Sequence, residues 1–248
     1  MTKIQIHYAQ ENCSYYTVCE STEVRVDLSA VDDFYRRMGE RQHNNYLKFL
    51  EFWQSDEGEA KLLAPKALVK TISYDTFKEV FGDVKAKIPK SINTVVMAVW
   101  TIGIDLEKKS SELTSAIGSM MTGLLVDVAG SVALYKMHDI LFDWIRDNIT
   151  ADKNKFICGE YYPGIGSMRQ DLMENIIKLG NTFEEIGVKA SGTSLLHPRK
   201  SQCSFIGMGN EAMEFHRKAE RCIPCNGKRC LYYQLGGCHV EVEHSTKY

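Results

Sequence analysis

The sequence lacks an excess of charge of either sign, has few prolines, and lacks an apolar run long enough to cross a membrane. Lysine and arginine number 30 against 32 aspartate and glutamate residues, a net charge of -2, so no overall field attracts nucleic acid or an anionic membrane surface. The two most apolar stretches, 91–104 and 113–126, each extend only about 14 residues before a charge, short of the roughly 20 that span a bilayer. We therefore expect neither a nucleic acid nor a membrane as a partner.

Targeting and catalytic motifs are also missing. The N-terminal segment MTKIQIHYAQ has no apolar core and no small-residue cleavage site, which predicts a cytoplasmic protein in a reducing compartment and hence no disulfides. The sequence motifs of common hydrolases and nucleotide-binding proteins do not occur either, so these function classes are disfavoured. Apolar residues make up 44% and charged residues 25% of the chain, which is the composition of an ordinary globular protein.

The pattern of apolar residues predicts an α+β fold with a small metal-binding tail. Residues 94–103 carry no charge and many β-branched side chains, as a central strand covered on both faces would. Residues 1–27 are predicted to form short strands, and residues 187–196 and 203–208 a hairpin joined by a turn. Helices, single or paired, are expected at residues 29–54, 74–81, 111–149, 167–180 and 210–221.

Several residues in these helices carry specific expectations. Ser29 is typical of a helix N-cap, and Ser167 with Gln170 fits a capping box after a loop at 158–167. Asp127 lies in an apolar helix, where an unpaired carboxylate costs several kcal/mol, so it should have a partner or face a cavity, and we expect a paired or capping carboxylate. Gly130 is a candidate for a kink in the long helix.

Half of the eight cysteines lie close together near the C-terminus, at Cys222, Cys225, Cys230 and Cys238. The C-x2-C step suits both tetrahedral zinc and an iron–sulfur cluster, because two intervening residues let both sulfurs turn to one centre. The seven residues between Cys230 and Cys238 favour a cluster wrapped by one loop over the paired steps of zinc sites. We therefore predict an iron–sulfur cluster of the 4Fe-4S type on these four cysteines, with zinc as the main alternative and no metal as the third.

A second candidate site is a glycine-containing loop directly before a predicted helix. It contains the residues Tyr162, Pro163, Gly164 and Gly166. At such a place backbone N–H groups and the helix dipole can hold an anionic group. Glycine pairs before helices more often serve tight turns, so the loop pattern by itself favours a structural role.

Two longer motifs give a family resemblance. Residues 160–166 are EYYPGIG, and residues 186–207 are IGVKASGTSLLHPRKSQCSFIG. Together with VVMAVWTIG at 95–103 and LLVDVAGSVA at 124–133, they follow the motif order of the activation (reactivation) domain of cobalamin-dependent methionine synthase. The chain resembles this family, and especially its stand-alone relatives in anaerobic bacteria, over about residues 90–209.

The resemblance implies a C-shaped α+β domain with an antiparallel sheet and flanking helices, which docks over a corrinoid and supports its reductive remethylation by S-adenosylmethionine. Pro163 and Gly164 match the loop that lines the S-adenosylmethionine site. The family arginine three residues before that proline is Glu160 here, and a glutamate would repel the methionine carboxylate that an arginine binds. Ile165 replaces a family tyrosine, and Tyr135 stands where relatives often carry a glutamate. These departures argue against S-adenosylmethionine binding.

The sequence therefore divides into an activation-domain-like body, residues 1–209, and a helix with a cysteine-rich tail, residues 210–248. Reduction of cob(II)alamin to cob(I)alamin needs an electron at low potential, and iron–sulfur clusters reach below about -400 mV. The leading hypothesis is an iron–sulfur protein that docks on a corrinoid protein or corrinoid-dependent methyltransferase and delivers this electron. The alternatives are a zinc-stabilised module that caps a corrinoid, and an S-adenosylmethionine-dependent remethylation partner of methionine synthase.

Overall fold

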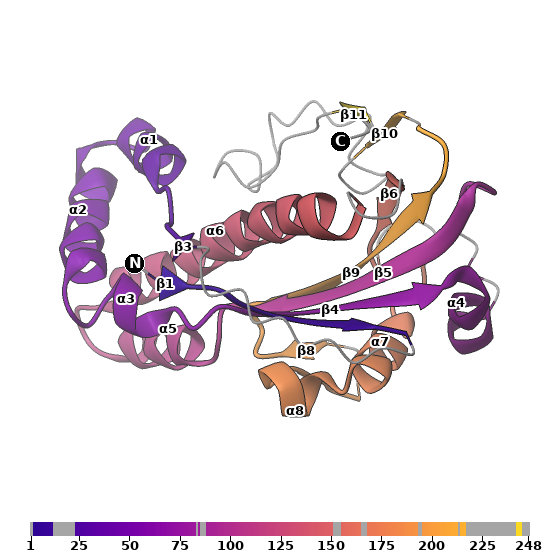
Figure 1. The fold of residues 1–248 in the computed structure, drawn as a ribbon. Coiled ribbons are helices and arrows are strands. Elements are labelled where there is room, and N and C mark those ends of the chain that lie inside the picture. Colours follow the sequence, from indigo (N-terminus) through magenta and orange to yellow (C-terminus); the bar gives the residue numbers. More distant parts are fainter. Residues whose placement is uncertain are drawn as a thin grey trace.

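The computed structural model describes residues 2–11, 23–82, 84, 88–150, 155–164, 168–192, 195–212, 214–216 and 242–244. Its centre is a five-stranded mixed sheet (Figure 1). In spatial order the strands are β2 (Gln5–Gln10), β4 (Lys66–Ser73), β5 (Ile92–Thr101), β9 (Ser201–Gly209) and β6 (Phe156–Tyr161). The α+β class and the central position of β5 are confirmed.

The resemblance implied an antiparallel sheet, but the observed sheet also contains one parallel pair. Strands β2 and β4 run parallel, whereas the other three neighbouring pairs are antiparallel. A parallel pair needs a crossover connection, and here the connection includes three helices, α1 (Ser29–Arg37), α2 (Glu40–Gln54) and α3 (Glu59–Leu62). This helical excursion returns the chain to the same end of the sheet.

Helices cover both faces of the sheet. The long helix α6 (Met120–Ile145) crosses one face and continues into a π-helical turn, Arg146–Thr150, while α5 (Asp105–Ser115) packs beside its first half. The other face carries α4 (Tyr74–Phe81), α7 (Leu172–Gly180) and α8 (Thr182–Ile186) (Figure 1). Three two-stranded ladders complete the described part: β1 (Thr2–Lys3) with β3 (Glu23–Val24), β7 (Lys189–Ala190) with β8 (Leu196–His197), and β10 (Glu214–His216) with β11 (Val242–His244).

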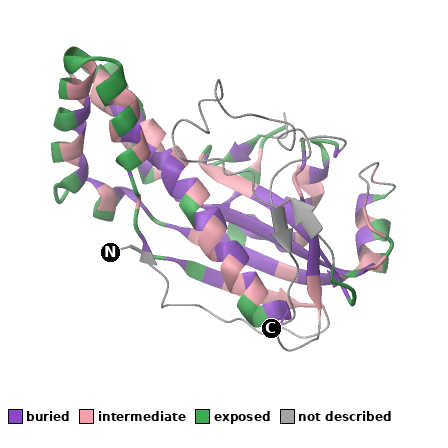
Figure 2. Cartoon of the chain, turned by 90° about the horizontal axis from the view of Figure 1, so that it is seen from above, coloured by how far each residue is buried: buried purple, intermediate pink, exposed green. Residues whose placement is uncertain are grey.

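Each face of the sheet has its own apolar core because side chains alternate along every strand. On β5, Val96, Ala98 and Trp100 belong to the core under α6, whereas the residues between them belong to the core under α4 and α7. Figure 2 shows the central strands of the sheet largely buried and the α1–α2 pair largely exposed on its outer side. The absence of charge from β5 thus has a direct cause, since both of its faces are covered.

Helix α6 is more apolar than a surface helix because it is the main cover of one core. Unlike the apolar runs judged from the sequence, which ended at the first charge, the segment Met120–Thr150 has the length and composition that would allow it to cross a membrane, and half of its most apolar window is buried within this fold. The helix does not break at Gly130, where a kink was expected. That glycine instead lets the side chain of Leu106, on α5, approach the helix closely.

Two predicted helix starts are wrong. Ser29 is the first residue of α1 and not its N-cap, which is Leu28, and the backbone N–H of Ser29 donates to Asp27 Oδ1 at 2.9 Å. Helix α7 begins at Leu172 rather than at the predicted capping box, and the preceding stretch from Phe156 to Tyr161 is strand β6 instead of a loop. Gly159 is typical of a turn in the sequence, but it lies within strand β6.

Two pairings near the C-terminal end also differ from expectation. The segment after Gly187 does not form a hairpin with β9, since β7 pairs with the short β8, and β9 lies between β5 and β6. The helix predicted at 210–221 is wrong over residues 214–216, which form strand β10. Local turn signals mark where a strand ends but do not identify its partner.

Candidate functional site

The candidate site lies where strand β6 ends and its loop turns toward α7. A hollow of about 330 Å³ opens there between the loop, the first turn of α7 and the start of β9. Its lining is mainly apolar, with the longer polar side chains of Gln170, Arg199 and Gln202 around it. The lining residues are Tyr162, Pro163, Gln170, Met173, Leu195, Leu196, Arg199, Ser201, Gln202 and Cys203. The predicted residues Tyr162 and Pro163 are part of this lining, and Gly164 directly follows them with a positive φ of 80°. Gly166 lies outside the described residues.

Arg199 is fixed at the edge of the hollow by helix α5. Its backbone N–H donates to Glu107 Oε2 at 2.8 Å and its Nε donates to Glu107 Oε1 at 2.9 Å. Next to it along the chain, Lys200 Nζ lies 2.9 Å from Asp127 Oδ2, so Asp127 is a paired carboxylate, as expected. These two contacts tie the turn before β9 to α5 and α6.

The described cysteines are poor ligands and poor nucleophiles. Cys203 lines the hollow but is only 3% exposed, and burial raises the pKa of its thiol to about 12. Burial also raises the pKa of Cys158. A thiol must lose its proton to bind metal or to attack, so burial disfavours both reactions at Cys158 and Cys203. In the described part of the chain, no group of three or more histidine, cysteine or carboxylate side chains is arranged to hold a metal ion.

Behind the hollow lies a buried polar cluster that the sequence did not predict. Both carboxylate oxygens of Glu160, on β6, lie 3.0 Å from Nε2 of His138, on α6. The hydroxyl of Tyr162 lies 3.0 Å from the same nitrogen, and Asp139 Oδ1 lies 3.4 Å from Nδ1 of the ring. The indole of Trp100 packs beside the imidazole with ring centroids 5.4 Å apart.

The centre of this cluster is a buried ion pair between His138 and Glu160. The side chain of Glu160 is 0% exposed and that of His138 is 9% exposed. Burial by itself would lower the pKa of His138, but the Glu160 carboxylate and the hydrogen bonds to Asp139 and Glu160 outweigh it and raise the pKa to about 9. His138 is therefore positively charged at neutral pH. Glu160, which was expected to face and repel a ligand carboxylate, instead faces α6 and is neutralised within the protein.

A sequence signal for this pair exists in hindsight. Glu160 lies in a strand and His138 in a helix whose other inward residues are almost all apolar. Buried charges occur almost only in pairs, so two isolated ionisable residues on elements that cover the same core are candidates for partners. The register that brings them together, however, follows only from the packing of α6 on β6.

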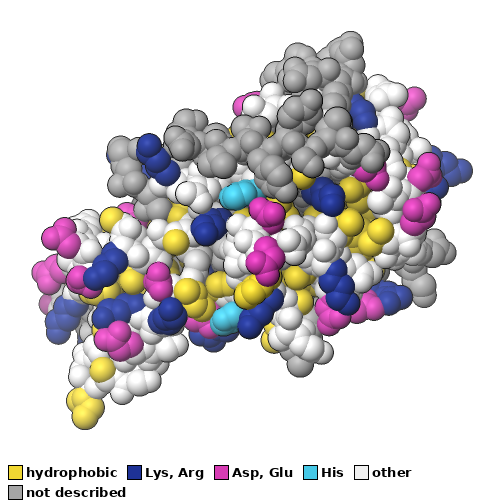
Figure 3. All heavy atoms as spheres, turned by 60° about the horizontal axis from the view of Figure 1, so that its bottom comes forward, with side chains coloured by type: hydrophobic (Ala, Val, Ile, Leu, Met, Phe, Trp, Pro, Cys, Tyr) yellow, Lys and Arg dark blue, Asp and Glu magenta, His cyan; other side chains and the backbone are white. Residues whose placement is uncertain are grey.

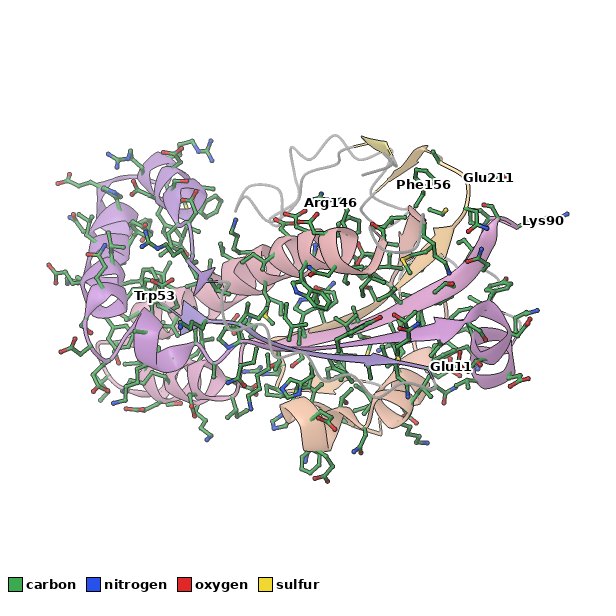
Figure 4. All side chains as sticks on the ribbon, in the orientation of Figure 1. Glu11, Trp53, Lys90, Arg146, Phe156 and Glu211 are labelled. Atoms are coloured by element: carbon green, nitrogen blue, oxygen red, sulfur yellow. The ribbon has the colours of Figure 1, made fainter. Side chains whose placement is uncertain are left out.

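The predicted metal-binding segment is held at both ends by described strands. Strand β10 pairs antiparallel with β11, with Glu214 opposite His244 and His216 opposite Val242. Cys222, Cys225, Cys230 and Cys238 lie between these strands and outside the described residues. Figure 4 shows Glu211, just before β10, at the same end of the molecule as Phe156, the first residue of β6. The tail therefore leaves the body beside the edge strand β6.

Comparison of the chain with protein-family models and with curated proteins finds no match.

Proposed function

We propose that the chain is an iron–sulfur protein that docks on a corrinoid protein or corrinoid-dependent methyltransferase and supplies the electron that reduces cob(II)alamin to cob(I)alamin. The observation that carries the proposal is the pairing of β10 with β11. Residues 217–241 connect these two paired strands in the sequence, and all four clustered cysteines lie in that segment.

The donor set fits an iron–sulfur cluster. Four thiolates are the usual ligands of such clusters, and Cys222, Cys225, Cys230 and Cys238 supply four within a short stretch. Strand pairing at the ends of this segment removes part of the entropy cost of bringing distant ligands together. A bound cluster would supply a single electron at low potential, which an external reductant must restore after each turnover.

The body of the protein supports a role without a methyl donor. Next to the loop that resembles the S-adenosylmethionine site, the positive charge of His138 is taken up by Glu160, and both side chains are buried. The resemblance places an arginine at position 160, where it would bind the methionine carboxylate. With this position occupied by an internal ion pair, we propose electron delivery rather than remethylation as the function.

The surface offers a docking site without a strong charge of one sign. On the face shown in Figure 3, described basic and acidic side chains alternate, with apolar atoms between them. Leu195, at the edge of the hollow, is 60% exposed although it is apolar. We propose that the body contacts the corrinoid partner around Leu195 mainly through shape and apolar contacts, so that binding depends little on salt.

The test begins with the metal. The purified protein is reconstituted anaerobically with iron and sulfide, its metal and sulfide contents are determined, and the dithionite-reduced form is examined by EPR. We expect about four irons per chain and the signal of a reduced cluster, both lost in Cys225→Ser. Cys19→Ser, which changes a cysteine outside the tail, is the matched control and should retain both. A colourless protein with one equivalent of zinc would contradict the proposal and favour the zinc-stabilised capping module.

A further inference from the structure

We propose that His138 and Glu160 are the positioning residues of the hollow at the end of β6: their buried ion pair holds the hydroxyl of Tyr162 and thereby keeps one wall of the hollow in a single conformation. This inference goes beyond the proposed function, because it concerns the hollow of the body and requires neither the metal nor a corrinoid partner.

The first step of the argument is the connection between the pair and the wall. Tyr162 both lines the hollow and contacts the pair, with its Oη 3.0 Å from His138 Nε2. It follows Glu160 by two residues, immediately after strand β6. A displacement of Glu160 or His138 is therefore transmitted to the wall directly, without an intervening residue.

The second step is the charge state that this geometry requires. Each ring nitrogen of His138 faces a carboxylate, Glu160 at Nε2 and Asp139 at Nδ1. A neutral imidazole has only one N–H, so it would direct a lone pair at one of the two carboxylates. Only the imidazolium donates at both positions, and its Nε2–H is then shared between Glu160 and the Tyr162 hydroxyl.

The third step is the burial of the pair. The groups that face the imidazole come from every element packed around it: Asp139 on α6, Glu160 on β6, Tyr162 in the loop, and the rings of Trp100 and Phe142. Among these described groups the only opposite charges are the two carboxylates, and that of Glu160 is fully buried. Because the pair is buried, solvent does not readily replace a lost contact, and loss of either partner shifts the Tyr162 hydroxyl.

The test uses Cys203 as a reporter of the wall. Its thiol lines the hollow and is buried, so its alkylation by a small neutral reagent such as iodoacetamide requires the hollow to open. The rate at Cys203 is followed by peptide mass spectrometry in the full-length protein. We expect His138→Gln and Tyr162→Phe each to raise this rate about tenfold at pH 7, the change that the loss of one buried hydrogen bond would allow.

The controls separate positioning from general destabilisation. Tyr162→Phe removes one hydroxyl and leaves the ion pair intact, so it decides the question even if His138→Gln fails to fold. His43→Gln, which breaks a contact of 2.8 Å with Asp32 on α1, should leave the rate at Cys203 unchanged.

The pH dependence of the alkylation rate at Cys203 distinguishes a positioning role of His138 from a merely structural one. The ratio of the His138→Gln rate to the wild-type rate should fall toward one above about pH 9, where His138 of the wild type also loses its charge. Ionisation of the thiol itself cancels in this ratio. An unchanged rate in Tyr162→Phe, or a ratio that does not vary with pH, would overturn the proposal.

Discussion

At the scale of single residues, the chain resolves a conflict that its sequence alone leaves open. Glu160 stands at a position where the family resemblance places an arginine, and sequence reasoning interpreted it as a carboxylate facing a ligand. The structure pairs it with His138 in the core instead. The sequence alone shows that a glutamate replaces the family arginine at position 160. The role of this glutamate follows only from its neighbour in the fold, His138, which lies 22 positions away in the sequence. Removal of one partner from such a buried pair costs about 3–5 kcal/mol, because the other charge is left uncompensated.

The charge of His138 predicts how stability varies with pH. Its pKa is raised from 6.5 to about 9 in the folded protein, so the folded state binds the proton more tightly than the unfolded state does. The stabilisation is complete below about pH 6.5 and is lost as the pH rises through 9. We expect the free energy of unfolding, measured with urea, to decrease between these values in the wild type and to vary much less in His138→Gln. Equal slopes in the two proteins would show that the histidine is not charged in the fold.

At the scale of elements, sequence pattern succeeded where burial alone decides the structure. The uncharged stretch around Val96 is the central strand, and the helix at 74–81 was predicted at its observed bounds. Sequence pattern gave wrong predictions where the structure depends on which strands pair with each other. Strand β6 was interpreted as a loop because Gly159 imitates a turn, and β7 was assigned to β9 because the intervening residues imitate a hairpin. Strand partners depend on contacts between distant parts of the chain, which local signals do not contain.

The contact between α5 and α6 can be tested at two glycines of the same helix. A Cβ at Gly123 would lie 2.5 Å from the backbone nitrogen of Thr114, on α5, whereas a Cβ at Gly130 would meet the side-chain end of Leu106 at 2.6 Å. Backbone atoms cannot move aside as a leucine methyl can. We expect Gly123→Ala to lower the free energy of unfolding by about 2–3 kcal/mol. In Gly130→Ala, relaxation of Leu106 and the better helix propensity of alanine should offset most of the loss. Equal effects at the two sites would contradict this packing.

At the scale of the whole molecule, the two apolar cores lie on the two faces of the sheet, and the predicted cysteine-rich tail follows them in the sequence. The described buried apolar residues extend from Ile4 to Met208 and surround the sheet on both faces. The clustered cysteines begin only at Cys222. The predicted division at residue 209 thus falls directly after the last of these buried residues, and it stays a prediction. The spacing of the cysteines predicts a thiolate cluster, which stays a prediction, but the sequence did not predict the pairing of β10 with β11, since β10 was predicted as part of a helix.

Because the proposed metal ligands lie outside the buried cores in the sequence, removal of the metal should change hydrogen exchange only locally. In hydrogen exchange followed by mass spectrometry, chelation should abolish the protection of the amides of β10 and β11, which pair with each other at the two ends of the cysteine-containing segment. The amides of β4, β5 and β9, which lie in the covered sheet, should keep their protection. In Cys225→Ser the chelator should have no effect. Loss of protection throughout the sheet would show that the metal stabilises the entire fold.

The most direct test of the proposed function is a single-turnover electron transfer under anaerobic conditions. The cluster-loaded protein is reduced, freed of excess dithionite and mixed with a corrinoid protein in the cob(II)alamin state, and the absorbance of both partners is followed. We predict that cob(I)alamin forms in proportion to the cluster oxidised, that Cys225→Ser abolishes its formation and that Cys19→Ser does not. Oxidation of the cluster without cob(I)alamin, or no reaction in the mixture, would contradict the account.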